Sequence, residues 1–114
     1  MMKVAGFKRN LMELVGEVGY IKKLEIIAET ANTLKVRLVI NDFCFIQVYV
    51  NFKKRLKNYV LILHDQRVYG KDCDAGRWHE HPWRDPEKHI FKKEVPLKVF
   101  FFEVYNGLRK RNLL

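Results

Sequence analysis

The sequence predicts a single α+β domain spanning residues 1–114, in which an antiparallel β-meander of four or more strands is flanked by an N-terminal and a C-terminal helix. Three observations predict this fold class. Apolar residues recur at helical spacing near both ends of the chain, and between those ends they alternate with polar residues. The sequence also lacks a Gly-rich phosphate loop and the strand-helix alternation of nucleotide-binding α/β folds.

The first helix is expected over residues 7–18, where an apolar stripe lies opposite charged and polar residues. Gly16 or Gly19 is expected to end it, because glycine readily adopts the left-handed conformation common at helix C-termini. Residues 20–29 change to a period of two, which predicts a first strand. The helical stripe consists of Phe7, Leu11, Leu14, Val15 and Val18.

Two further strands are expected over residues 33–40 and 43–52. Asn41-Asp42 between them is a tight-hairpin signal, because both residues tolerate positive φ. The segment 43–52 is apolar on both sides, which is typical of a central strand that is covered twice. A helix or a second copy of the chain could cover its second face, so homodimerisation is one hypothesis.

A basic hairpin tip is expected at residues 53–57, followed by a fourth strand over residues 59–63 that extends as far as Tyr69. We expect residues 69–95 to form a long loop rich in histidine and tryptophan. Pro96 then precedes a second amphipathic helix over residues 97–111, in agreement with the preference of proline for helix N-termini.

The charge balance points to an acidic partner. Lys and Arg outnumber Asp and Glu by 22 to 13, and the net charge is +9. Such a field attracts nucleic acid first and an acidic protein second. No apolar stretch reaches the roughly 20 residues of a membrane-spanning helix. No secretory signal is visible, so we expect a cytoplasmic location. Cys44 and Cys73 have no metal or redox spacing and are expected to be free thiols.

Residues 69–89 are the segment most suited to carry chemistry, since they hold three of the four histidines, both tryptophans and two of the three prolines. Pro82 and Pro86 stiffen the backbone, and Asp85-Pro86-Glu87 resembles the start of a short helix. A long loop stiffened in this way is more often functional than accidental.

His79 and His81 are two positions apart, so both imidazoles project from the same face of an extended backbone. Near neutral pH, imidazole can act as general base and then as general acid, as RNA cleavage through the 2′-hydroxyl requires. Positive and aromatic neighbours could hold the phosphate and stack on unpaired bases. The candidate phosphate contacts are Lys71, Arg77 and Arg84, and the candidate stacking residues are Trp78 and Trp83.

The same segment has two other interpretations. With Asp72, Asp74 or His89 as a third ligand, the two histidines could bind zinc or manganese, although the spacing matches no known cage and no cofactor is expected. Alternatively, the tryptophans pack the loop onto the sheet and the histidines supply hydrogen bonds. His64, outside the segment, is expected to be structural.

Several motifs resemble those of the small TumE-type toxins of prokaryotic toxin-antitoxin modules. The motifs are Tyr20-Ile21, Leu24-Glu25-Ile26, Tyr69-Gly70-Lys71-Asp72 and Trp78-His79-Glu80-His81-Pro82. The usual aspartate-asparagine pair of that family appears here as Asp72-Cys73. The resemblance implies an antitoxin partner and a growth-inhibiting target, with RNA as the expected target.

The leading hypothesis is therefore a toxin-like protein that binds RNA and, as a further step, cleaves it as a ribonuclease. His79 and His81 are the expected proton-transfer pair, Asp72 orients a histidine, and Arg77 and Arg84 contact phosphate. One alternative is a non-enzymatic module that binds nucleic acid or an acidic protein such as an antitoxin. Another is a metal-dependent hydrolase.

Overall fold

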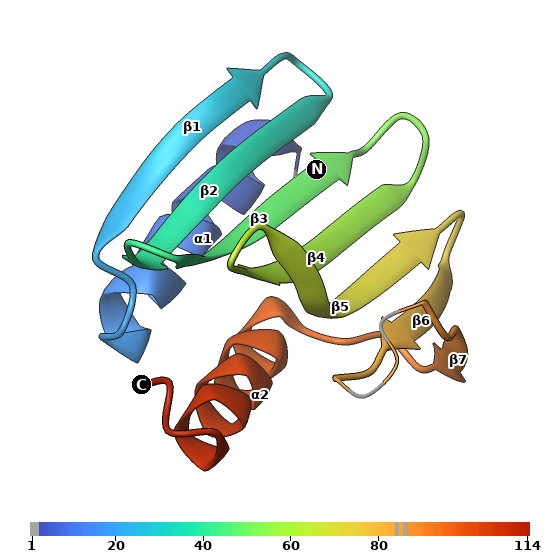
Figure 1. The fold of residues 1–114 in the computed structure, drawn as a ribbon. Helices are drawn as coiled ribbons and strands as arrows, with labels where there is room; N and C mark the ends of the chain where they lie inside the picture. The colour runs from blue at the N-terminus through green and yellow to red at the C-terminus, as the bar shows by residue number, and fades with distance from the viewer. Residues whose placement is uncertain (1–2, 84, 86) are drawn as a thin grey trace.

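The computed structural model describes residues 3–83, 85 and 87–114. Its strands form one sheet in which each strand pairs antiparallel with the next along the chain (Figure 1). This confirms the α+β class and the meander flanked by two helices. The elements are α1 (Val4–Val18), β1 (Lys23–Glu29), β2 (Thr33–Asn41), β3 (Cys44–Asn51), β4 (Leu56–Leu63), β5 (Gln66–Asp74), β6 (Arg77–His81), β7 (Ile90–Lys92) and α2 (Leu97–Lys110).

The two helices lie close to where the sequence places them. Of the two candidate glycines, Gly19 ends α1, with φ of 77°. Pro96 immediately precedes α2. The positive charges of Arg109 and Lys110 in its last turn interact favourably with the negative end of the helix dipole. Within the described part of the chain, neither helix is long and apolar enough to cross a membrane.

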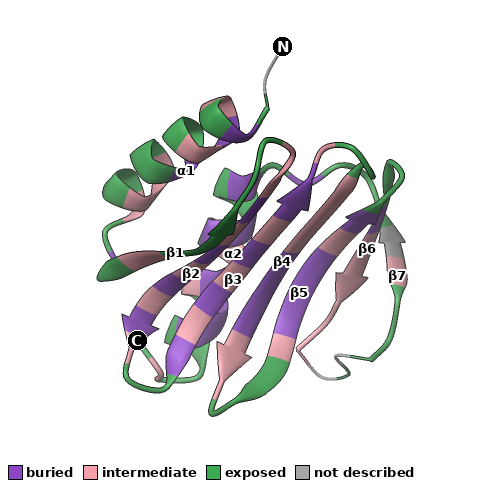
Figure 2. Ribbon diagram, turned by 90° about the horizontal axis from the view of Figure 1, so that it is seen from above, coloured by how far each residue is buried: buried purple, intermediate pink, exposed green. Residues whose placement is uncertain are grey.

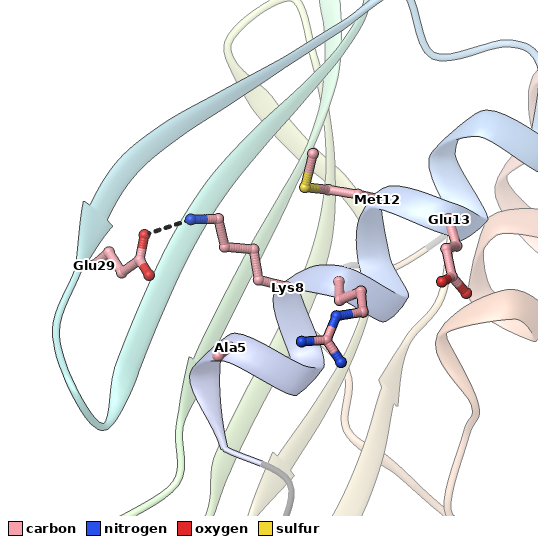
Figure 3. Close-up of a pocket in the computed structure, with 6 residues that line it drawn as sticks. Ala5, Lys8, Met12, Glu13 and Glu29 are labelled. Atoms are coloured by element: carbon pink, nitrogen blue, oxygen red, sulfur yellow. Dashed lines mark hydrogen bonds and ion pairs between the residues drawn. The ribbon is translucent and has the colours of Figure 1, made fainter.

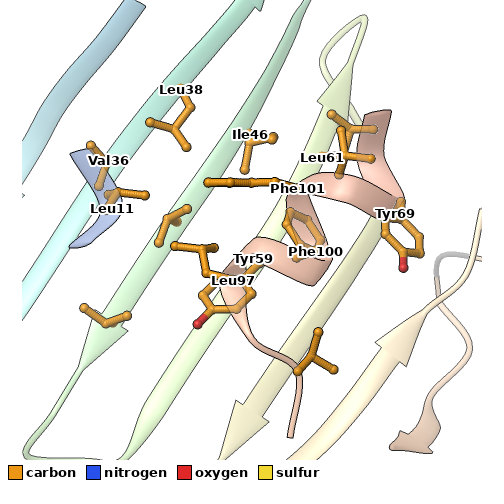
Figure 4. Packing of buried hydrophobic residues seen from close by; sticks show 14 of the residues in the cluster. Leu11, Val36, Leu38, Ile46, Tyr59, Leu61, Tyr69, Leu97, Phe100 and Phe101 are labelled. Atoms are coloured by element: carbon orange, nitrogen blue, oxygen red, sulfur yellow. The ribbon is translucent and has the colours of Figure 1, made fainter. Parts of the chain in front are cut away.

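Both helices contribute to one core against one face of the sheet. Buried and part-exposed positions alternate along β2 and β3, so every second side chain of these strands faces the core. Phe100 and Phe101 of α2 lie across the strands, with Leu11 of α1 beside them (Figure 4). The Tyr20 hydroxyl donates a hydrogen bond to the backbone oxygen of Phe101 at 2.6 Å. The buried apolar residues of β2 and β3 are Leu34, Val36, Leu38, Ile40, Cys44, Ile46, Val48 and Val50.

The opposite face of the sheet, called the open face below, carries the part-exposed side chains that alternate with the buried ones. Lys35 of β2 and Phe45 and Tyr49 of β3 lie on it, and all three are partly exposed. Figure 2 shows the alternating buried and part-exposed positions along these strands. No helix among the described residues covers this face. Homodimerisation through it stays a prediction.

Two hairpins differ from the prediction. β4 ends at Leu63, so the expected extension to Tyr69 is wrong: the chain turns at His64 and Asp65, whose φ values of 49° and 64° suit a two-residue loop. Histidine is not a usual turn residue, so the sequence signal was weak. The earlier hairpin turns at residues 42–43, one residue later than expected, because Asn41 pairs with Cys44 across the turn.

The expectation of a loop over residues 69–95 is wrong for most of the segment, which contains the second half of β5, all of β6 and β7. The period-two pattern is hidden because Lys71 and Glu80 occupy inward positions where an apolar residue is usual, and they neutralise one another there. The short helix expected at Asp85-Pro86-Glu87 depends on Pro86, which is outside the described residues.

Both cysteines are free thiols, as expected, and both are buried. Burial raises the pKa of the Cys44 thiol to about 11. Cys44 therefore stays protonated at neutral pH and acts as a small apolar core residue.

The neighbouring residues Phe101 and Phe102 test the assignment of the buried face. Phe101 is fully buried and Phe102 is 63% exposed. We expect Phe101→Ala to lower the free energy of unfolding by about 3–5 kcal/mol, because it removes core contacts and leaves a cavity. The matched Phe102→Ala should change it by less than about 0.5 kcal/mol. Urea denaturation measures both, and equal losses would contradict this packing.

Candidate functional site

The β5–β6 hairpin places the histidines of the sequence motif on the open face. Trp78 points the other way, is 7% exposed, and has its ring centroid 5.8 Å from that of Tyr59 in the core. Since side chains alternate along a strand, His79 and His81 on either side of it lie on the open face together. The expectation that they share one face is met by the geometry of β6.

Asp72 is held beside these histidines by the pairing of β5 with β6. It lies directly opposite His79, and its Oδ2 is 2.7 Å from Nε2 of the neighbouring His81. A carboxylate can only accept a hydrogen bond, so Nε2 of His81 carries the proton in this contact. When His81 is neutral, its lone pair is therefore on Nδ1.

A third imidazole completes the group. The His89 ring centroid lies 4.5 Å from that of His81 and 5.7 Å from that of His79. The sequence singled out His89 only as a metal ligand, although it belongs to the same His-rich segment. Below, the histidine cluster means Asp72, His79, His81 and His89.

The cluster has one polar atom with an unusual environment. Oδ1 of Asp72 is buried and has no hydrogen-bond partner among the described residues. Desolvation without a partner disfavours such a group, so folded proteins retain few of them, and functional sites are one place where they persist. The Asp72 carboxylate thus has one oxygen hydrogen-bonded to His81 and one oxygen without a hydrogen-bond partner among the described residues.

The geometry does not assemble a metal cage. Among the described residues, no three His, Cys, Asp or Glu side chains are placed to share one metal ion. Oδ2 of Asp72 is instead 2.7 Å from Nε2 of His81. The arrangement favours proton transfer between side chains over metal ligation.

Two of the sequence candidates lie on the helix side and cannot contact a ligand on the open face. Lys71 is 4% exposed, with Nζ 2.7 Å from Oε1 of Glu80 and 3.6 Å from Oε1 of Glu103 on α2. Trp78 is buried in the core. Both were expected to bind substrate, and the structure gives them a packing role instead.

Trp83 also packs against the protein. Its ring stacks on Tyr69 with centroids 5.5 Å apart, and the guanidinium carbon of Arg111 lies 3.9 Å from its ring centroid. A Cβ at Gly107 would lie 2.3 Å from Trp83, so only glycine admits the ring against α2. This is the packing role that the sequence left open for the tryptophans.

The two candidate arginines have different outcomes. Arg77 is exposed at the start of β6, opposite Asp74, in the same alternation as His79. It is therefore positioned on the open face near the cluster. Arg84 is outside the described residues.

A charged network ties the β5–β6 hairpin to α2 beneath the cluster. The Tyr69 hydroxyl donates to Oε2 of Glu103 at 2.9 Å, and burial together with the charge of Glu103 raises the pKa of Tyr69. Burial alone would raise the pKa of Glu80, but the hydrogen bond and charge of Lys71 outweigh it, so that pKa is lowered. The network favours the charged form of Glu80 and ties the inward face of the hairpin to α2.

A hollow of about 550 Å³ lies far from this chemistry, between α1 and the edge strand β1. Figure 3 shows Lys8 reaching across it to Glu29, an ion pair of 3.0 Å. None of its lining residues is a histidine or an aromatic residue. It therefore lacks the neighbouring imidazoles that the histidine cluster brings together, and the histidine cluster is the stronger candidate site.

No protein-family model, curated protein or solved structure matches this chain. The resemblance to TumE-type toxins therefore stays a prediction. What this chain can do has to be argued from the cluster itself, in which the motif positions Asp72, His79 and His81 are in contact or adjacent.

The pH dependence of stability tests the buried network through Glu80→Gln. Because the folded-state pKa of Glu80 is lowered, its contribution is present above the ordinary glutamate pKa of about 4.3 and is lost as pH falls through the folded value. At pH 7 we expect the variant to be less stable by about 1–3 kcal/mol, since Lys71 loses a charged partner.

Urea denaturation from pH 7 down to pH 3 should show this difference shrinking below the ordinary glutamate pKa. Glu17→Gln, at an exposed position of α1, is the matched control and should show little difference at any pH. A Glu80→Gln deficit that is independent of pH would contradict the network.

Proposed function

We propose that this protein is a toxin-like ribonuclease that binds RNA and cleaves it through the 2′-hydroxyl. One observation carries the proposal: the 2.7 Å contact between Asp72 and His81, with the imidazoles of His79 and His89 beside it on a face that no described helix covers. A carboxylate that orients one imidazole next to a second is an arrangement suited to acid-base catalysis.

The chemistry needs two proton transfers. A neutral imidazole takes the proton of the 2′-hydroxyl, and the 2′-oxygen attacks the adjacent phosphorus. The bond from phosphorus to the 5′-oxygen breaks, and a protonated imidazole gives its proton to that leaving oxygen. The products are a 2′,3′-cyclic phosphate and a 5′-hydroxyl, and no external oxidant or metal is required for the balance.

We assign the base to His81, because the contact with Asp72 fixes its tautomer and leaves the lone pair on Nδ1. Asp72 is then a positioning residue that also stabilises the imidazolium once it forms. His79, directly opposite Asp72, is assigned as the acid. Arg77 on the same face is assigned to the phosphate, where negative charge builds up in the transition state.

The overall charge supports RNA as the ligand. A net charge of +9 on 114 residues favours association with a polyanion and makes it sensitive to salt. We also propose an acidic antitoxin as protein partner. That part of the proposal rests on the motif resemblance and on the same charge complementarity.

The double variant His79→Ala/His81→Ala tests the proposal. We expect it to lower the rate of RNA cleavage by about 10²–10⁴-fold, the usual contribution of acid-base catalysis. Cleavage of a labelled single-stranded RNA on a denaturing gel measures the rate, and urea denaturation checks that the variant folds.

The matched control is His64→Asn, which removes the one histidine of the sequence that lies outside the cluster. His64 lies in the β4–β5 turn, stacked on Phe43 rather than on the cluster, and asparagine tolerates its positive φ. We expect its cleavage rate to equal that of the parent. Unchanged cleavage by a folded double variant would refute the assignment. RNA binding without cleavage by the parent would favour a binding module instead.

A further inference from the structure

The histidine cluster is one end of a row of polar and aromatic side chains that crosses the open face. Strand pairing places each member directly opposite the next on neighbouring strands from β2 to β6. Because neighbouring strands lie about 4.8 Å apart, Tyr49 on β3 and His79 on β6 are separated by roughly 14 Å along this row. The row consists of Lys35, Tyr49, Asn58, Asp72 and His79.

A shallow concavity of about 320 Å³ occupies the part of the open face next to the cluster. Its described lining contains two cations, two side-chain amides and one aromatic ring, and no carboxylate. The polar lining residues are Lys35, Arg67, Gln47, Asn58 and Tyr49, and Val60 and Ile62 complete it.

Two features prepare this surface for a flat ligand. Asn51 donates a hydrogen bond to the hydroxyl oxygen of Tyr49 at 3.2 Å, which restrains the ring. Gly70, between Val60 on β4 and His81 on β6, leaves no side chain between the concavity and the cluster. A Cβ there would lie 3.0 Å from the backbone oxygen of Tyr59, so the position is suited to glycine.

We propose that the open face binds a segment of single-stranded RNA and leads it to the histidine cluster. One base stacks on Tyr49, the amides of Gln47 and Asn58 contact its edge, and Lys35 and Arg67 contact phosphates. The inference rests on the proposed function in that the ligand is RNA. To that function it adds a base-binding subsite, a requirement for unpaired bases and the path of the RNA across the sheet from β2 to β6.

The chemistry of the concavity favours a single strand over a duplex and over a protein. Stacking on an aromatic ring needs a base that has left its own stack, whereas a duplex presents phosphates and groove edges. Sheet faces of comparable width accommodate two or three stacked bases in known RNA-binding modules. An acidic protein could contact the two cations, but the restrained ring and the two amides beside it match the flat face and the polar edge of a nucleobase.

Binding can be measured without turnover by using a fluorescein-labelled 2′-O-methyl RNA decamer, which has no 2′-hydroxyl to react. We expect Tyr49→Ala to raise its Kd by roughly 5- to 150-fold, the loss of one stacked base, while Tyr49→Phe keeps the ring and stays within about threefold. Phe102→Ala removes an exposed ring from the helix side and should leave Kd unchanged.

Lys35→Gln is a second variant that leaves the Tyr49 ring in place, and it should weaken binding. It should also reduce the slope of log Kd against log salt concentration by about 0.7, the value for one phosphate contact on a single strand. The same decamer annealed to its complement should bind the parent more weakly. Urea denaturation identifies any variant that does not fold.

The RNA subsite is rejected if the folded Tyr49→Ala and Lys35→Gln variants bind the decamer as tightly as the parent does, a result that would favour a protein partner for this face. It is also rejected if the duplex binds as tightly as the single strand.

Cleavage of unmodified RNA separates failure of the subsite from failure of the proposed function. Cleavage with a KM unaffected by Tyr49→Ala rejects the subsite alone. Tyr49-dependent binding of RNA that is never cleaved rejects the ribonuclease alone and supports the subsite.

Discussion

Trp78 decides which residues of the β5–β6 hairpin reach each face of the sheet. Burying an aromatic side chain removes roughly 150–250 Å² from water, worth about 4–6 kcal/mol. A slip of one residue would expose that ring and bury an imidazole, so the register of β6 is strongly set. His79 and His81 lie on the open face as a consequence, and Asp72 follows because it pairs opposite His79.

The two faces of the sheet then serve different purposes. The helix side holds the apolar core and the network in which buried Lys71 is paired with the carboxylates of Glu80 and Glu103. The open face contributes less burial, so its positions can carry polar groups at little cost to stability. The rigid helix side therefore supports the Asp72–His81 contact from below, which is how a site gains preorganised geometry.

The sequence was informative where burial followed a simple period. The stripe of α2 and the alternation of β2 predicted both elements closely, and the spacing of His79 and His81 predicted their common face. It was uninformative where charged residues take the place of apolar ones. Inward-facing Lys71 and Glu80 interrupt the apolar alternation of β5 and β6, so the sequence predicted a loop there. The proximity of His89 and the row through Tyr49 depend on strand register, which no local pattern encodes.

The chemical identity of the new RNA ends distinguishes cleavage by proton transfer to and from the imidazoles of the histidine cluster from other routes of cleavage. A labelled single-stranded RNA is incubated with the protein in EDTA, and the new ends are identified by their response to phosphatase and kinase. The account predicts 2′,3′-cyclic phosphate and 5′-hydroxyl ends, formed without added metal. New ends carrying a 5′-phosphate, or cleavage that appears only with a divalent cation, would contradict it.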